Sequence, residues 1–237
     1  MTSKPQLDGH VAIVTGGTRG IGLAITSGFV ARGARVVASG RSQGDLDAVV
    51  AEFGSSVAVV QGDVADPTVA ATLVQTAIDR FGGVDSIINN AGVGTFAPVA
   101  EMSDEDWHRL IATNLTGVFL CTKAAIPALK TRGGGWIINI SSLAGRNSFA
   151  GGAAYCASKA GLNAFTESLM LEVRPDNIRV TTVMPGSVQT GFSSGGDGPE
   201  SDWKLSPDDV AQVVFDLLGH SARSLPSRVE IRPSRPK

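Results

Sequence analysis

Cysteine, histidine and tyrosine are scarce in this chain of 237 residues, which contains two, three and one of them. Cys121 and Cys156 lie far apart in apolar segments and form no CxxC motif, so we expect both to be reduced and buried. The histidines, His10, His108 and His220, are scattered without further ligands at metal spacing. The sequence therefore predicts neither a disulfide framework nor a metal site.

Excess charge and long apolar runs are also lacking. The chain has 20 basic and 22 acidic residues, a net charge of −2, which provides no overall basic field for a nucleic acid. No uncharged apolar run approaches the ~20 residues of a membrane span, and the first residues show no leader pattern. We expect a cytoplasmic protein with neither a nucleic acid nor a membrane as partner.

Short β-branched runs do recur, and longer segments of helical period separate them. This alternation predicts one α/β domain over residues 1–237, a Rossmann-like doubly wound parallel sheet of about seven strands with helices on both faces. The expected strands are His10–Val14, Arg35–Ser39, Val57–Gln61, Ser86–Asn89, Trp136–Ser141, Ile178–Met184 and Arg228–Ile231.

Local signals mark the helix ends and the irregular segments. Ser103 and Ser206, each followed by acidic residues, predict helix starts. Pro127 predicts a kink or an early end in the helix that begins near Ser103. Residues 187–205, rich in Gly and Ser at their centre, are expected to be a mobile loop beside the substrate, and 233–237 a terminal tail.

A glycine turn follows the first strand and leads directly into a helix. The stretch TGGTRGIG, 15–22, would let backbone N–H groups approach a diphosphate at the positive end of that helix. It is neither a P-loop nor a G-x-G-x-x-G motif, and a tight packing turn is the alternative. The residues expected at the phosphates are Gly16, Thr18, Arg19, Gly20, Ile21 and Gly22.

The second strand ends without the carboxylate that bonds a ribose 2′-hydroxyl in NAD-binding folds. Arg41 follows this strand instead, and Arg41 with Arg19 could clamp a 2′-phosphate by charge-assisted hydrogen bonds. NADP(H) is therefore the predicted cofactor, and two solvated loop arginines are the alternative.

The single tyrosine, Tyr155, lies four residues before Lys159, one turn apart on one helix face. A phenol that works as a proton donor near neutrality needs its pKa lowered by about 3 units, on the order of 4 kcal/mol. A cation ~4.5 Å away at an effective dielectric of ~20 supplies roughly 3.7 kcal/mol. The alternative is a packed phenol beside an amine that reaches solvent. Ser142, at the end of the fifth strand, favours a catalytic group.

These motifs, in this order, resemble the short-chain dehydrogenase/reductase family. The resemblance rests on TGGTRGIG, on NNAG at 89–92, on Ser142 with Tyr155-x-x-x-Lys159 and on Pro185-Gly186, and it covers residues 7–190. It implies that Tyr155 is the general acid that protonates the carbonyl oxygen. It implies further that Lys159 lowers the pKa of this tyrosine and binds the nicotinamide ribose, and that Ser142 orients the carbonyl.

The resemblance also implies roles for residues that local spacing does not single out. Asn114 matches a helix asparagine that helps to hold a water-linked proton path, although a buried amide bonded to the backbone would look the same in the sequence. Further cofactor contacts are implied for the adenine, the adenosine ribose and the carboxamide, by Asp63 and Val64, by Asn90, Ala91 and Gly92, and by Pro185, Gly186, Val188 and Thr190. With Tyr155 and Lys159, these complete the predicted cofactor site.

The family also implies a homodimer or homotetramer that pairs the helices containing Asn114 and Tyr155. Two departures stand out: the chain ends in SLPSRVEIRPSRPK instead of a Val-Asp-Gly-Gly type of ending, and residues 190–206 are shorter than the helical lid of many members. The first puts one usual subunit contact in doubt, and the second suggests an open substrate pocket.

The leading hypothesis is NADPH-dependent reduction of a ketone or aldehyde carbonyl to an alcohol. A 3-oxoacyl carrier-protein reductase is the alternative within the class, with Lys130, Arg132 and Arg174 as a basic patch for an acyl-carrier protein, although Asp176 lies among them. Two hypotheses of a different kind are a catalytically silent dinucleotide-binding sensor and an NAD-linked alcohol dehydrogenase. The four residues Asn114, Ser142, Tyr155 and Lys159 argue against the sensor, and the missing acid after the second strand argues against NAD.

Overall fold

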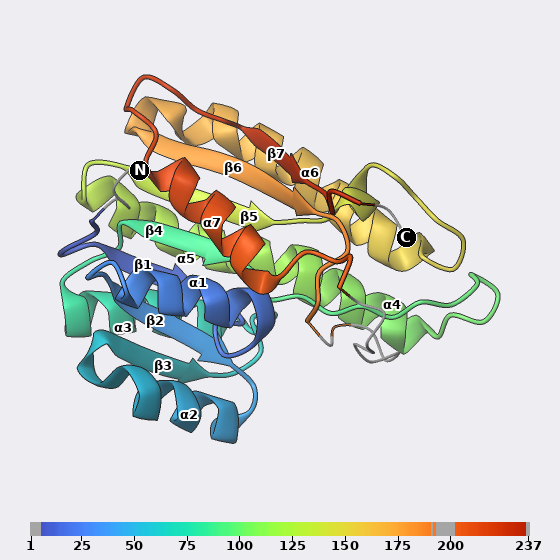
Figure 1. Ribbon diagram of the computed structural model, residues 1–237, viewed down its shortest axis with the longest axis horizontal. Coiled ribbons are helices and arrows are strands. Elements are labelled where there is room, and N and C mark those ends of the chain that lie inside the picture. The colour runs from blue at the N-terminus through green and yellow to red at the C-terminus, as the bar shows by residue number, and fades with distance from the viewer. Residues whose placement is uncertain (1–5, 191, 193–201, 236–237) are drawn as a thin grey trace.

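The protein folds around one seven-stranded sheet in which every pair of neighbouring strands is parallel. The computed structural model describes residues 6–190, 192 and 202–235. The strands are β1 (Val11–Val14), β2 (Arg35–Gly40), β3 (Val57–Gln61), β4 (Ser86–Asn89), β5 (Gly135–Ile140), β6 (Ile178–Pro185) and β7 (Arg228–Ile231). They lie in the order β3-β2-β1-β4-β5-β6-β7, and their arrows point the same way in Figure 1.

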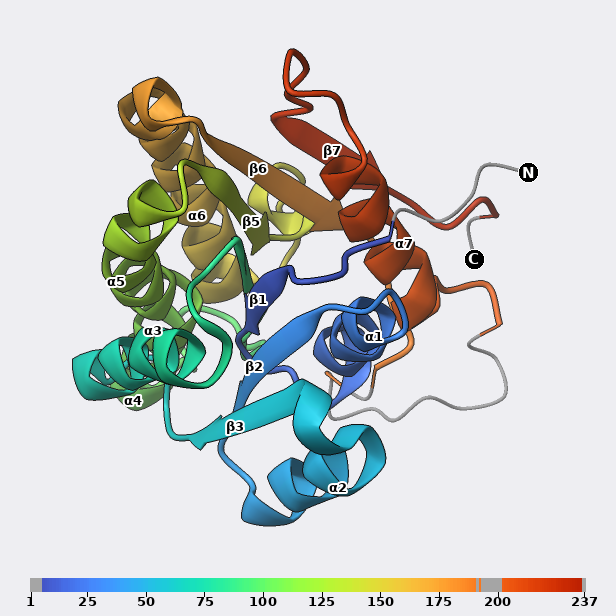
Figure 2. The same cartoon turned by 90° about the vertical axis from the view of Figure 1, so that its left-hand side faces the viewer.

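Helices cover both faces of this sheet. They are α1 (Gly20–Val30), α2 (Gln43–Phe53), α3 (Pro67–Phe81), α4 (Asp104–Ile111), α5 (Gly117–Thr131), α6 (Ala153–Val173) and α7 (Pro207–Leu218). Figure 2 shows α3, α5 and α6 on one side of the sheet and α1 and α7 on the other. Each layer has its own apolar core, one with Leu73, Leu129 and Leu169, the other with Phe29 and Phe215. The predicted doubly wound α/β fold is confirmed, with strand ends within one residue of the expected positions.

The caps of α4 and α7 follow from their sequences. The Ser103 hydroxyl accepts a hydrogen bond from the Asp106 backbone N–H (3.1 Å), and Ser206 forms a full capping box with Asp209. Both helices therefore begin directly after the predicted serine.

The prediction of a break at Pro127 is wrong in its position. The helix continues to Thr131, one turn past the proline, and the departure from α geometry lies earlier, in a π-helical segment at Ala112–Thr116. Proline has no N–H, so the bond that position 127 would donate to the Lys123 carbonyl is missing, and the helix continues past this gap for one more turn. The run Asp104–Thr131 has the length and composition of a membrane span, but α5 packs its buried face against α3 in the core, as a soluble core helix does.

A chain of hydrogen-bonded, buried polar side chains links β4 and β5 to the helices α5 and α6 that pack on them. The Asn89 side-chain amide donates to Asn139 Oδ1 (2.8 Å) and to Thr122 Oγ1 (3.0 Å). Asn139 in turn donates to Thr166 Oγ1 (2.8 Å) on α6. Because Asn89 and Asn139 are paired in the register of β4 and β5, this chain fixes the level at which both strands end.

The loop predicted at 187–205 lies in part outside the described residues, which omit 191 and 193–201. Its two described ends are joined by a parallel bridge between Val188 and Leu205, with Gln189 N–H donating to the Leu205 carbonyl (2.9 Å). In the tail, residues 236–237 likewise lie outside the described part.

Candidate active site

The predicted site residues gather at one edge of the sheet, where all the parallel strands end. The order of strands reverses between β1 and β4, and a crevice at the carboxyl ends on either side of this reversal is where doubly wound folds bind ligands. The glycine turn follows β1, Asn90–Gly92 follow β4, Ser142 follows β5, and Pro185 ends β6. Their clustering is therefore a consequence of topology.

The glycine turn has the shape of a diphosphate cradle. Gly16 has φ +63°, in the left-handed region, and a Cβ on Gly22 would lie 2.0 Å from the Gly16 carbonyl oxygen. Arg19 caps α1 without a side-chain hydrogen bond, so the first N–H groups of α1 face the turn. These residues fit the diphosphate of a dinucleotide, at the positive end of the helix dipole.

The segment after β4 is bonded directly to this turn. The Asn90 side-chain amide donates to the carbonyl oxygens of Thr15 (3.0 Å) and Gly16 (3.2 Å), and the Thr15 hydroxyl accepts from the N–H groups of Asn90 and Ala91 (2.9 and 3.0 Å). Thr15 is not among the predicted site residues, although it opens the TGGTRGIG motif. It joins the two halves of the crevice.

The ends of β2, β3 and β6 surround the same turn. A Cβ on Gly40 would lie 2.9 Å from Thr18 Oγ1, so the end of β2 touches the turn; Arg41 and Arg19, which follow these two residues in the chain, are both exposed. Asp63 is exposed and Val64 buried after β3, Thr190 lies over Gly20, and Val188 packs on the core. Ile21, Gly186 and Gly92 are half-buried along the same edge.

Tyr155 and Lys159 lie in the first turns of α6, both buried, at 9% and 4% exposure. The Lys159 ammonium group donates to the Ile140 carbonyl at the end of β5 (3.0 Å), and its Nζ lies 5.9 Å from the centroid of the Tyr155 ring. The Ser142 hydroxyl accepts from the Ala144 N–H (3.1 Å) and lies near enough to the Tyr155 phenol to lower its pKa. The hydroxyl, the phenol and the ammonium group are thus contiguous.

The expected direction of the Tyr155 pKa is wrong for the protein chain by itself. Burial raises the pKa of Tyr155 above its usual value, and the nearby Ser142 hydroxyl offsets this only in part. Burial also lowers the pKa of Lys159 to about 8. The spacing of Tyr155 and Lys159 on one helix predicts that the phenol and the ammonium group attract each other. It does not predict that both are buried in a site of low polarity.

Asn114 is fully buried in the π-helical segment, and its side chain forms hydrogen bonds with the backbone. Its Oδ1 accepts from the Val93 N–H (2.8 Å), and its amide donates to the Val93 carbonyl (3.0 Å) and to Ser158 Oγ (3.1 Å). Ser158, another residue that the sequence did not single out, donates to the Tyr155 carbonyl (2.7 Å). Asn114 thereby ties the segment after β4 to α6, and its role in a proton path stays a prediction.

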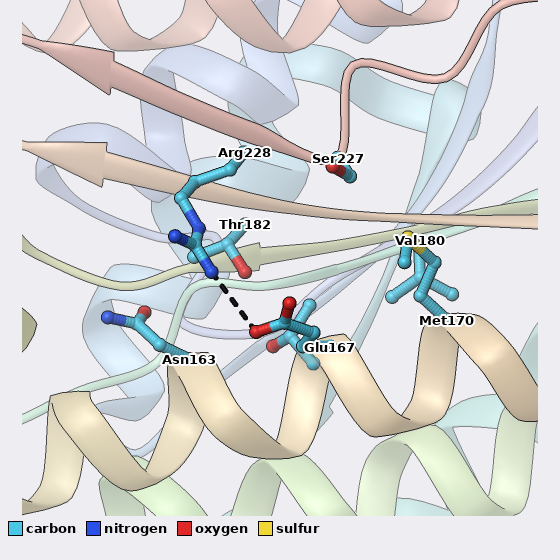
Figure 3. Close-up of a pocket in the computed structure, with 8 residues that line it drawn as sticks. Asn163, Glu167, Met170, Val180, Thr182, Ser227 and Arg228 are labelled. Carbon is cyan, nitrogen blue, oxygen red and sulfur yellow. Dashed lines mark hydrogen bonds and ion pairs between the residues drawn. The ribbon is translucent and has the colours of Figure 1, made fainter.

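A separate cavity of about 310 Å³ lies between α6 and the strands β6 and β7. Asn163, Thr182 and Met170 line it, and an ion pair between Glu167 and Arg228 (3.1 Å) crosses it, as Figure 3 shows. None of the four predicted catalytic residues lines this cavity, so we separate it from the active site.

Comparisons with known proteins agree with this geometry. The family model for short chain dehydrogenase matches residues 10–197. The chain is 36% identical over 217 residues to the 3-alpha-(or 20-beta)-hydroxysteroid dehydrogenase of Mycobacterium bovis, covering 92% of this chain and 78% of the relative. It is 40% identical over 191 residues to the 3-oxoacyl-[acyl-carrier-protein] reductase of Synechocystis, covering 79% and 77%.

Among solved structures, the closed form of serine dehydrogenase complexed with NADP⁺ superposes with a TM-score of 0.87 at 31% identity, covering 93% of this chain and 94% of that one. Sequence and fold therefore agree, and the chain belongs to the short chain dehydrogenase family of oxidoreductases that act on carbonyl or alcohol substrates.

Proposed function

We propose that this protein reduces a ketone or aldehyde carbonyl to an alcohol with NADPH. The observation that carries the proposal is that Ser142, Tyr155 and Lys159 gather at the sheet edge that also holds the glycine turn. A bound nicotinamide cofactor supplies the hydride for the carbonyl carbon. The protein's own side chains have to hold the carbonyl and deliver the proton.

Tyr155 is suited to deliver that proton. Because burial raises its pKa, the side chain is a protonated phenol at neutral pH, which is the form a general acid needs. Ser142 and Tyr155 would both donate to the carbonyl oxygen, and the Tyr155 proton would pass to it as the alcohol forms. A buried phenolate would remain on the protein.

Lys159 offsets the cost of that phenolate. With a pKa of about 8 the amine is mostly protonated at pH 7. Taken over the 5.9 Å from Nζ to the ring centroid, with an effective dielectric of ~20, the attraction amounts to about 3 kcal/mol. Lys159 therefore acts mainly on the product side of the proton transfer, where the charge develops.

The preference for NADPH rests on Arg19 and Arg41. Arg41 and Arg19 directly follow Gly40 and Thr18, which lie close together, and no carboxylate follows β2 there. A ribose 2′-phosphate would meet two cations at the start of α2, which suits a dianion. The NADP⁺ bound to the serine dehydrogenase named above supports the same choice.

A 3-oxoacyl carrier-protein reductase is the second candidate, favoured by the Synechocystis relative. The proposed basic patch counts against it. Lys130 is paired with Asp176 (2.8 Å) and Arg132 with Asp85 (2.8 Å). These residues also precede strands, at the edge of the sheet opposite to Tyr155, so they do not present an acidic carrier to the site.

The test of the proposal is Tyr155→Phe, assayed by NADPH oxidation with a panel of ketones, aldehydes and a 3-oxoacyl thioester. We expect turnover to fall by roughly 10²- to 10⁴-fold, because the general acid is lost while the ring is kept. NADPH binding, followed by its fluorescence, should be retained in the variant.

Two results would contradict the proposal. If the wild type binds NADPH but turns over nothing in the panel, a dinucleotide-binding sensor is the better description. If Tyr155→Phe reduces ketones at the wild-type rate, the proton comes from another group.

A further inference from the structure

Three partly exposed phenylalanine rings surround the Tyr155 phenol. Phe96, Phe149 and Phe192 are 43%, 48% and 43% exposed, and they are three of only nine phenylalanines in the chain. Phe96 lies edge to face with Tyr155 (centroids 5.5 Å apart), Phe192 lies tilted to it (5.9 Å), and Phe96 contacts Phe149 (5.6 Å). We call these three rings the aromatic rim. Phe96 and Phe192 reach the Tyr155 ring, and Phe149 extends the apolar surface beyond Phe96.

The rim is held in place by the backbone. The Ala97 N–H donates to the Gly151 carbonyl (2.9 Å), which ties the segment carrying Phe96 to the segment that follows Phe149. A Cβ on Gly152 would lie 2.5 Å from the Phe149 ring, and one on Gly94 would lie 2.5 Å from the Phe192 ring. Both rings therefore pack directly against the backbone of a glycine, and this contact holds each ring in its position.

The surface beneath the rim is apolar as well. Tyr155 packs in a small cluster with Leu110, Ala144, Ala154 and Cys156, and Val93 and Met102 lie against it. A substrate that reaches Ser142 and Tyr155 would thus place its carbonyl on two hydroxyl groups and the rest of its body against rings and aliphatic groups. Partly exposed aromatic rings in tilted and edge-to-face arrangements offer further ring contacts of the same kind.

We propose that the substrate is an uncharged ketone whose carbonyl lies in a ring or within one methylene of a ring, and that Phe96 and Phe149 select that ring. This inference rests on the proposed function, since it names the substrate class of the same site. Each favourable contact between two rings raises the affinity by about 2- to 12-fold. An open-chain ketone of equal size gains only the non-directional hydrophobic contribution to binding.

The experiment compares two methyl ketones of nine carbons, 1-phenylpropan-2-one and nonan-2-one, whose carbonyls have the same alkyl environment. The ratio of their kcat/KM values with NADPH is measured for wild type, Phe96→Leu and Phe149→Leu. Leucine keeps most of the apolar area and removes the ring. Phe119→Leu is the matched control, because Phe119 is 44% exposed on α5 and lies against Phe165 and Lys123, outside the rim.

We expect the wild type to favour the phenyl ketone, and the ratio to fall by about 2- to 12-fold in each rim variant and to stay unchanged in the control. Because the readout is a ratio of two rates on one protein, a loss of active enzyme cancels. Equal rates on both ketones in the wild type, or a wild-type ratio in both rim variants, would overturn the inference and leave the reductase proposal standing.

A binding measurement separates the two proposals. Calorimetric titration of each ketone into the NADP⁺-loaded wild type and rim variants reports ring selection without turnover. Ring-selective binding that needs Phe96 and Phe149, in a protein that reduces neither these ketones nor any member of the panel, would support the rim and contradict the reductase. Absence of ring-selective binding in the wild type would contradict the rim whatever the turnover.

Discussion

Keeping Lys159 charged inside the protein has a cost that depends on pH, and Lys159→Met should reveal it. The lysine is 4% exposed, and burial lowers its pKa from 10.5 to about 8. The unfolded chain therefore binds more protons at this site than the folded chain between pH 8 and pH 10.5. Wild-type stability should rise with pH across this interval as far as Lys159 contributes to it.

The magnitude follows from the two pKa values. At pH 7 Lys159 is protonated in both the folded and the unfolded chain, so the full difference between its two pKa values counts against folding. At 1.36 kcal/mol per pKa unit, this cost is on the order of 3 kcal/mol. At pH 9.5 the folded lysine is neutral and the unfolded one still protonated, which leaves roughly 1 kcal/mol. Relative to the methionine variant, the wild type should gain about 2 kcal/mol in free energy of unfolding from pH 7 to pH 9.5.

Urea unfolding of both proteins at these two pH values measures this change. Other groups that titrate in the interval cancel in the difference between wild type and variant. The hydrogen bond to Ile140, which methionine cannot make, shifts the difference at both pH values alike to first order. Lys123→Met removes an exposed lysine of α5 and serves as the control. A difference between wild type and Lys159→Met that is independent of pH would refute the reasoning.

Two further predictions concern the cofactor and the core. Arg41→Ala should weaken NADPH binding by about tenfold and leave NADH binding unchanged, since a charge-assisted hydrogen bond is worth about 1.5–3 kcal/mol and Arg41 is exposed; fluorescence titration checks this, and equal losses for both cofactors would contradict it. Gly28→Ala should destabilise the protein by about 1–2 kcal/mol in urea, although alanine favours a helix by about 1 kcal/mol, because its Cβ would lie 2.3 Å from the buried Phe215 ring. Gly44→Ala on α2, with open space around its Cβ, should instead stabilise it, and a stabilised Gly28→Ala would show that the core yields more easily than its packing suggests.

Much of the fold could be predicted from the sequence because its signals are local. Each buried parallel strand is a short β-branched run, and helices such as those after Ser103 and Ser206 carry their own caps. The error at Pro127 has a simple origin. A proline removes one hydrogen bond, to the carbonyl four residues before it, and here the helix continues past that missing bond to Thr131.

The site residues fall into two groups, those that local sequence spacing predicts and those that depend on contacts between distant segments. Tyr155 and Lys159 could be placed together because four residues span one helical turn, and the crevice followed from the carboxyl ends of parallel strands. The aromatic rim could not be predicted, since Phe96 and Phe149 meet through a hydrogen bond between Ala97 and Gly151, 54 positions apart. The raised pKa of Tyr155 depends on burial by these same segments, so its direction was inaccessible to a calculation on one helix.

The polar chain through Asn89 and Asn139 bears on how faithfully this sheet assembles. Strands as apolar as β4 and β5 could slide along one another with little change in buried area, and a slip of one residue turns every side chain to the opposite face. Here such a slip would separate two amide groups with no water to replace the lost bonds, a penalty that nearby apolar residues cannot recover. Asn90 and Ser142 follow these strands, so their relative position depends on the register of β4 and β5. The hydrogen bond between the two buried amides therefore aligns the residues that we propose contact the cofactor and the carbonyl.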